Sequence, residues 1–184
     1  MHKKYTFDNR RLSLLSTCFL RSLLFSMNHL FIDAYNVICA TDSLRQLMQG
    51  SLDAARDQLA EIVRSSHDVE GLHIVLVLDS RQDSLQVEYP YKVKTFEFVY
   101  APAEVSADGV IERMVAQVEE SVDTTVVSND RMVRESARAN GALALRPEAL
   151  LEWARACESR LLHEAHRRRD VNGKEFRNSI NFES

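Results

Sequence analysis

Apolar residues along this chain fall into short unbroken runs, separated by stretches in which they recur every three or four positions. The runs are rich in β-branched and aromatic residues and cover 29–33, 72–79, 94–100, 124–130 and 142–145. Such runs are typical of strands that are buried on both faces of a sheet. The sequence therefore predicts five strands inside the protein.

Helices are predicted between most of these strands. Apolar residues at helical spacing form one face in each of three segments, which are 52–63, 110–118 and 150–161. Pro147 lies near the first turn of the last segment, a position that helices tolerate well. Buried strands that alternate with amphipathic helices indicate a Rossmann-like three-layer α/β sandwich with a mostly parallel central sheet.

The composition favours a single compact domain. The chain has 184 residues, of which 45% are hydrophobic, and it has five Gly, three Pro and no repeat or low-complexity tract. A chain of this length can bury one well-packed core, and its composition argues against disorder. We place the domain at 29–165, between an N-terminal extension at 1–28 and a basic C-terminal tail at 166–184.

The first 26 residues have basic residues followed by an apolar run, as a signal peptide does. Arg21 interrupts this run, which is also too short to span a bilayer. Met27 offers a natural start, which would make 1–26 an upstream extension; a disordered tail and an export signal are the alternatives.

The three cysteines are far apart and lack metal-ligand spacing. We therefore expect neither disulfide bonds nor a zinc site, and a location in the reducing cytoplasm. We also expect no membrane partner.

Charge is distributed unevenly along the chain. Residues 1–28 hold five of the 23 Lys and Arg residues but one of the 27 acids, so the rest of the chain has 18 basic and 26 acidic residues. An acidic domain does not attract polyanions through its bulk charge. A partner that carries phosphate would therefore need a local basic patch or metal ions to bind here.

Aspartates stand where the predicted strands end. Asp33, Asp79 and Asp130 end three of the runs, and Asp108 begins the helical segment after the run at 94–100. Because the carboxyl ends of parallel strands lie along one edge of a sheet, we expect these four carboxylates to converge. Clustered carboxylates repel one another unless a cation lies among them, and Mg²⁺ and Mn²⁺ prefer oxygen ligands. The pattern predicts a divalent-metal site.

Other polar residues near these aspartates are candidates for auxiliary roles, namely Asn36, Ser128, Asn129 and Glu112. Asn36 follows Asp33 by three residues, close enough to orient a water molecule or a scissile phosphate. Glu112 follows Asp108 by four residues, so both project from one helical face.

A purely structural interpretation stays open for two of the aspartates. Asp108 could complement the dipole in a first helical turn, and Asp130 could be an N-cap. We predict no cap role for Asp33, because no helical pattern begins directly after it.

Several enzyme classes with strand-end acids or phosphate loops are excluded by spacing. A phosphoaspartyl hydrolase needs a second Asp two residues after the first, and that position is Tyr35. The chain also lacks the G-x-G-x-x-G, G-x-x-x-x-G-K-[ST] and G-x-S-x-G motifs of dinucleotide binders, P-loop enzymes and serine hydrolases.

Four segments in order, "FIDAYNVI", "VLVLDS", "SADGVIERM" and "VVSNDRMVRESARANGA", make residues 29–150 resemble the bacterial YacP-like NYN ribonucleases of the PIN/FEN-like nuclease superfamily. The resemblance implies a metal-dependent endoribonuclease that uses Mg²⁺ or Mn²⁺. It matches Asp33, Asn36, Asp79, Asp108 and Asp130 to the acidic and amide positions of the family, and Glu112 to an auxiliary acid.

RNA is the partner that this resemblance implies, including mRNA or ribosome-associated RNA. Candidate RNA contacts are Tyr35, Arg81, Arg131, Arg134, Arg168 and Lys174. Tyr35 fits either stacking on an unpaired base or ordinary packing, and the basic run at 166–169 fits either RNA contact or a helix C-terminus that complements its own dipole. Two other functions remain: a non-catalytic RNA- or ribosome-binding module, and an enzyme that hydrolyses small phosphate esters.

Overall fold

A computed structural model describes residues 28–118 and 123–178, with side chains up to Arg169. The predictions for residues 1–26 lie outside the described residues. Within these ranges the chain alternates between strands and helices along most of its length. This alternation is the one that the sequence predicts.

Six strands of the described residues form one sheet in the order β3-β4-β2-β1-β5-β6. All neighbouring pairs are parallel except β3 with β4. The strands are β1 (His29–Asp33), β2 (His73–Asp79), β3 (Gln86–Glu88), β4 (Phe96–Ala101), β5 (Thr124–Val127) and β6 (Leu143–Leu145). The predicted mostly parallel sheet is confirmed, and β3 is an addition that the sequence analysis did not anticipate.

Helices cover both faces of this sheet. They are α2 (Ala34–Ala40), α3 (Asp42–Gly50), α4 (Leu52–Glu70), α5 (Ala107–Gln117), α6 (Arg131–Ala139) and α7 (Pro147–Asn178). Side chains of β1 alternate between the two faces: Leu30 and Ile32 pack with α2, α4 and α7, whereas Phe31 packs with α5 and α6. The three-layer α/β sandwich is therefore confirmed.

Local sequence signals set the ends of the long helix α4. The Ser51 hydroxyl accepts a hydrogen bond from the Ala54 N–H at 3.2 Å and so caps the first turn. Gly71 ends the helix with a φ of 65°, a left-handed conformation that favours glycine. The chain then enters β2 in the direction that makes it parallel to β1.

The strand order changes direction at β1. The chain first builds outward from β1 through β2 and β4, and it then returns to add β5 and β6 on the other side. The connection after β1 passes through α2, α3 and α4 on one face, and the connections through α5 and α6 lie on the other. In open α/β sheets, ligands bind at the carboxyl ends of the strands beside such a switch point.

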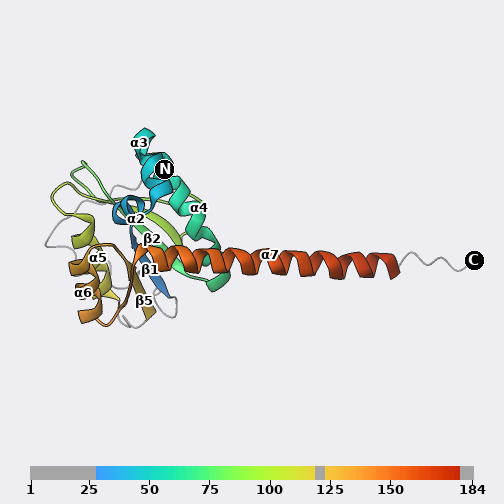
Figure 1. The fold of residues 1–184 in the computed structure, drawn as a ribbon. Helices are drawn as coiled ribbons and strands as arrows, with labels where there is room; N and C mark the ends of the chain where they lie inside the picture. The colour runs from blue at the N-terminus through green and yellow to red at the C-terminus, as the bar shows by residue number, and fades with distance from the viewer. Residues whose placement is uncertain (1–27, 119–122, 179–184) are drawn as a thin grey trace, which may run out of the picture.

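Helix α7 has two parts with different environments. Its first turns pack on α4, with Leu150, Ala154 and Cys157 buried. Arg160 still pairs with Glu70 of α4 at 2.5 Å, and beyond it the helix extends away from the body as an arm, which Figure 1 shows in orange to red. The predicted boundary at 165/166 falls inside this helix, which continues to Asn178.

No helix within 28–118 or 123–178 is long and apolar enough to cross a membrane.

Candidate functional site

Asp33 lies at the switch point, on the central strand β1 between β2 and β5. It is 2% exposed and caps α2, because its Oδ1 accepts a hydrogen bond from the Asn36 N–H at 3.1 Å. The expectation that Asp33 has no cap role is therefore wrong. The reason is that α2 begins directly after Asp33 but has only seven residues, too few to show helical periodicity in the sequence.

Two further side chains hold the Asp33 carboxylate. The Asn36 side-chain amide and the Ser128 hydroxyl both donate to Oδ2, the latter at 3.0 Å. Ser128 is fully buried at the end of β5, and its hydroxyl accepts a hydrogen bond from the Asp130 N–H at 3.0 Å. The two strands on either side of the switch point are thus joined through Asp33 and Ser128.

Asp79 and Asp130 reach the same edge and also bind backbone N–H groups. Asp79, at the end of β2, accepts from the Ala107 N–H at 2.9 Å, which ties β2 to the start of α5. Asp130 caps α6 by accepting from the Met132 N–H at 2.6 Å. The structural interpretation of Asp130 as an N-cap is confirmed, and both side chains are exposed at the edge.

Asp108 completes the group in the first turn of α5, where Ser106 is the N-cap. Burial raises the pKa of Asp108 to about 6, and the charge of Asp33, a hydrogen bond with Asp33 and the charges of Asp130 and Asp79 add to this effect. The four predicted aspartates therefore lie close enough to interact. We call Asp33, Asp79, Asp108 and Asp130 the carboxylate cluster.

The cluster has the chemistry of a site for a hard cation. The Asp33 charge contributes to the raised pKa of Asp108, so the two carboxyl groups lie close together, and a cation between them would offset their repulsion. Mg²⁺ is commonly held by one or two carboxylates together with water and substrate phosphate. Among the described side chains, no three His, Cys, Asp or Glu residues stand in an arrangement that could hold a metal by themselves. A cation here would therefore need most of its ligands from water and substrate.

The auxiliary candidates divide between the centre and the rim of this site. Asn36 and Ser128 contact Asp33 directly. Asn129 is exposed beside Asp130, and Glu112 is exposed one turn further along α5 than Asp108.

The predicted RNA-contacting residues occupy different environments. Arg81 is exposed two residues after Asp79, and the Arg131 side chain is 82% exposed, with its Nε 2.6 Å from Glu135 Oε1. Arg134 is only 7% exposed and donates to the Ser128 carbonyl at 2.8 Å. It therefore holds the backbone next to the site in place. Arg168 is exposed on the arm, and Lys174 lies further along α7, beyond the described side chains.

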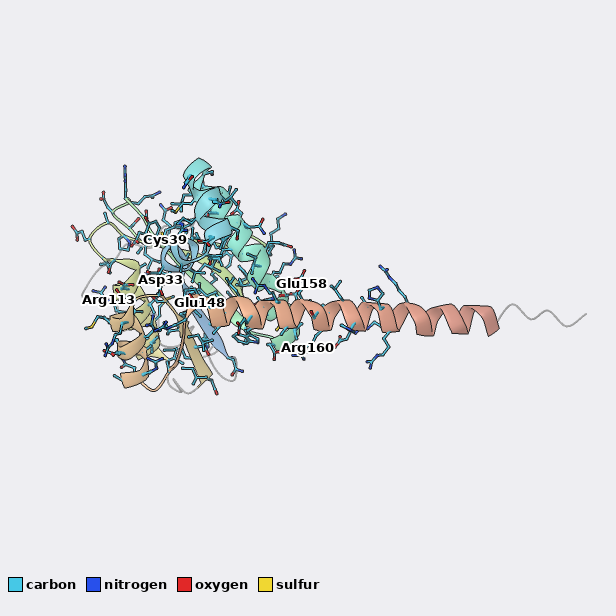
Figure 2. All side chains as sticks on the ribbon, viewed as in Figure 1. Asp33, Cys39, Arg113, Glu148, Glu158 and Arg160 are labelled. Carbon is cyan, nitrogen blue, oxygen red and sulfur yellow. The ribbon has the colours of Figure 1, made fainter. Side chains whose placement is uncertain are left out.

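Tyr35 stands beside the carboxylate cluster and is 49% exposed. A hydrogen bond with Cys39 raises the pKa of Tyr35, and the charge of Asp79 adds to the shift. Figure 2 labels Asp33, which caps α2, and Cys39, which lies in the last turn of that helix. The sequence analysis missed the apolar residues that surround Tyr35, because they come from separate elements.

Comparisons with known proteins agree with this fold. A family model described as the YacP-like NYN domain matches residues 30–184. Two crystal structures of Rae1 (YacP) from Bacillus subtilis are similar in fold: one has a TM-score of 0.62 and 22% identity, with 84% of this chain and 87% of that chain covered. The other, of a mutant form of the same Bacillus protein, has a TM-score of 0.64 and 23% identity, with 78% and 85% covered. A search of curated proteins gives no match.

Proposed function

The chain belongs to the YacP-like NYN domain family, a family of PIN-like nucleases, and we propose that it is a metal-dependent endoribonuclease. The observation that carries this proposal is the convergence of four aspartates from β1, β2, α5 and the start of α6 at the switch point. Carboxylates of this kind are ligands for a divalent cation, and such a cation can offset the negative charge of a phosphodiester.

In this proposal Asp33, Asp79, Asp108 and Asp130 would hold Mg²⁺ or Mn²⁺, one or two of them directly and the others through bound water. When bound, such a cation supplies positive charge that offsets a phosphodiester and lowers the pKa of water. The buried position of Asp33, and its hydrogen bonds with Asn36 and Ser128, fix the direction of its carboxylate before any ligand arrives. This preorganisation is the contribution of the fold.

Asn36 has a second role in this proposal. Its Nδ2 donates to Asp33, which leaves its amide oxygen as the atom that accepts a hydrogen bond from the attacking water. Glu112 and Asn129, at the rim, are assigned to contacts with outer water or the RNA strand. The water oxygen attacks phosphorus, the bond from phosphorus to the leaving ribose oxygen breaks, and the proton that the water loses passes through solvent to that ribose oxygen.

Exposed basic residues supply the contacts with RNA. Arg81 and Arg131 flank the carboxylate cluster, and Arg168 lies on the arm, so all three can reach phosphates. The exposed pair of Arg131 and Glu135 is weak in water and can be exchanged for a phosphate. We assign Arg134 to support of the site rather than to RNA because it is buried.

The proposed substrate is RNA with unpaired segments, including mRNA or RNA on the ribosome, in the cytoplasm. Cys39 and Cys157 are free thiols, which suits a reducing compartment.

A non-catalytic RNA-binding module is the second candidate. It is favoured by one observation: Asp33, Asp79 and Asp130 each accept hydrogen bonds from backbone N–H groups, so each has a structural task without metal. This candidate predicts RNA binding that does not respond to chelators.

The test is to incubate the protein with a pool of unstructured and ribosome-bound RNA in Mn²⁺, Mg²⁺ or EDTA, and to map new RNA ends. The endoribonuclease proposal expects internal cuts in either metal and none in EDTA. Binding without cuts under all conditions would support the non-catalytic module. Turnover of p-nitrophenyl phosphate without RNA cleavage would support an enzyme that acts on small phosphate esters.

A further inference from the structure

A hollow of about 240 Å³ lies beside the carboxylate cluster. Its lining residues are Tyr35, Ile38, Leu52, Leu78 and Asp79, and we call it the Tyr35 pocket. They come from α2, the start of α4 and the end of β2, and α2 packs against both α4 and β2. Sites for drug-sized ligands measure roughly 300–1,000 Å³, so this hollow suits a single ring system.

The walls of the pocket are apolar, and its mouth is open to solvent. Ile38 and Leu78 belong to the buried core and form the floor. Tyr35 and Leu52 are 49% and 44% exposed, although both are large apolar side chains. A lining that combines an aromatic ring with aliphatic side chains favours a flat group with an apolar face.

Asp79 is the single charged residue of the lining, and it connects the pocket to the proposed cleavage site. Its carboxylate accepts hydrogen bonds, so it favours a ligand edge that carries N–H donors and disfavours a phosphate. The same carboxylate belongs to the carboxylate cluster, where its charge acts on Asp108. Tyr35 is also only two residues from Asp33, on the turn that Asp33 caps.

A group in the pocket is therefore the immediate neighbour of a phosphate at the carboxylate cluster. In an RNA strand that neighbour is a base, which has flat apolar faces and, on its edges, N–H groups. A paired base cannot enter, because its edges and faces are already used in the duplex.

We propose that the Tyr35 pocket binds one unpaired base of the RNA strand, next to the phosphate that the carboxylate cluster cleaves. This inference rests on the proposed function and deepens it by naming the substrate: RNA that is single-stranded at the cut. Base stacking is tolerant of sequence, because every base has a flat face. The pocket therefore makes the protein selective for unpaired strands, with a preference for bases that can donate to Asp79.

The test measures RNA binding rather than cleavage. All proteins are full length and carry Asp33→Asn, so that the RNA stays intact, and the probe is an unstructured oligoribonucleotide in which one position at a time is abasic. Affinity is measured by fluorescence anisotropy for the Asp33→Asn protein and for the same protein with Tyr35→Ala, Tyr35→Phe or Leu52→Ala. Tyr89→Ala is the matched control, because Tyr89 is 45% exposed but does not line the pocket.

We expect one position at which the abasic substitution weakens binding about tenfold, as the loss of one base-aromatic stack does. Tyr35→Ala should weaken binding of the intact strand by the same factor. The Tyr35→Ala protein should then bind the abasic strand as tightly as it binds the intact strand. Tyr35→Phe and Tyr89→Ala should bind as the parent does, and Leu52→Ala should weaken binding about threefold. Tyr35→Ala leaves the fold intact because the side chain is half exposed.

The inference is overturned if the effect of every abasic substitution on affinity is the same with and without Tyr35→Ala. It is also overturned if Tyr35→Ala weakens the binding of duplex RNA as much as that of single-stranded RNA. Coupled binding without any cleavage by wild type in Mn²⁺ would support the pocket and overturn the nuclease proposal. Cleavage by wild type, with no coupling between Tyr35 and any abasic position, would support the nuclease proposal and overturn the pocket. If none of the proteins binds RNA, both proposals are overturned.

Discussion

The two ends of the central strands carry ionisable side chains in opposite arrangements. At the amino end, His73 Nε2 lies 2.6 Å from Glu97 Oε1, and the His29 ring packs on that of His73 with the centroids 5.2 Å apart. At the carboxyl end, four aspartates gather, and the pKa of Asp108 is raised to about 6 by burial and by the other three. One end therefore pairs His73 with an acid of the same chain, whereas the other accumulates charge of one sign.

This difference separates a structural arrangement from a functional one. The pair at the amino end is satisfied by its own partners and needs nothing from outside. The carboxylate cluster is held together by hydrogen bonds with Asn36, Ser128 and backbone N–H groups, even though its charges repel. We propose that this group binds a cation, so mutations at the two ends should have different consequences.

The largest effect is expected for Asp33→Asn. The amide keeps the size of the side chain but removes the charge at the centre of the carboxylate cluster, so RNA cleavage should fall by about 100-fold or more. Initial cleavage rates in Mn²⁺ measure this effect, and circular dichroism checks that the fold is retained. Unfolding of the variant would instead make Asp33 a structural residue.

Ser128→Ala should have the next largest effect. It removes one hydrogen bond to Asp33 and one from the Asp130 N–H, so we expect about tenfold slower cleavage and a loss of about 1–2 kcal/mol in the free energy of unfolding. Urea denaturation and initial rates measure the two quantities. Ser65→Ala is the control, because the Ser65 hydroxyl donates to the Ala154 carbonyl at 3.0 Å, away from the cluster. Equal loss of cleavage in both variants would contradict the role of Ser128.

Asp108→Asn should stabilise the protein in EDTA at pH 7 by about 1 kcal/mol, after allowance for solvent screening. The raised pKa means that the folded state binds the proton of Asp108 more tightly than the unfolded chain does. Stability of the wild type therefore falls as the pH rises from 3.8, the ordinary value, to about 6. Since the amide cannot ionise, the advantage of the variant should vanish towards pH 4. Denaturant titrations of both proteins across this pH range measure the difference in the free energy of unfolding. A difference that does not change with pH would contradict the raised pKa of Asp108.

The smallest effect on activity is expected at the amino end. Glu97→Gln weakens the hydrogen bond with His73, where both side chains are mostly buried, and should reduce the free energy of unfolding by about 1 kcal/mol. Cleavage should stay within twofold of wild type, because the pair lies at the opposite end of the strands. A loss of cleavage comparable to that of Ser128→Ala would remove the distinction between the two ends.

The sequence predicted the parts of the molecule that depend on strand direction. Since the strands are parallel, Asp33, Asp79 and Asp130 had to meet at one edge of the sheet. This prediction needed no information about the loops. The spacing of apolar residues predicted α4, α5 and α7, because each of these helices is long enough to show a helical period.

Short elements and long-range contacts were beyond the reach of sequence patterns. Helix α2 has only seven residues and β3 only three, so neither is long enough to show a clear period. The burial of Arg134 depends on its contact with the Ser128 carbonyl, six residues away across the end of β5. The Tyr35 pocket depends on how α2 and the start of α4 meet above β2, which no local pattern encodes.

Calorimetric titration of Mn²⁺ into wild type and Asp33→Asn tests the central claim most directly, because it asks whether the carboxylate cluster is a cation site without any assumption about the RNA. We predict that wild type binds Mn²⁺ and that Asp33→Asn binds it at least about tenfold more weakly, as loss of an important group at a metal site does. Equal affinity in the two proteins, or no binding by wild type at millimolar Mn²⁺, would contradict the account.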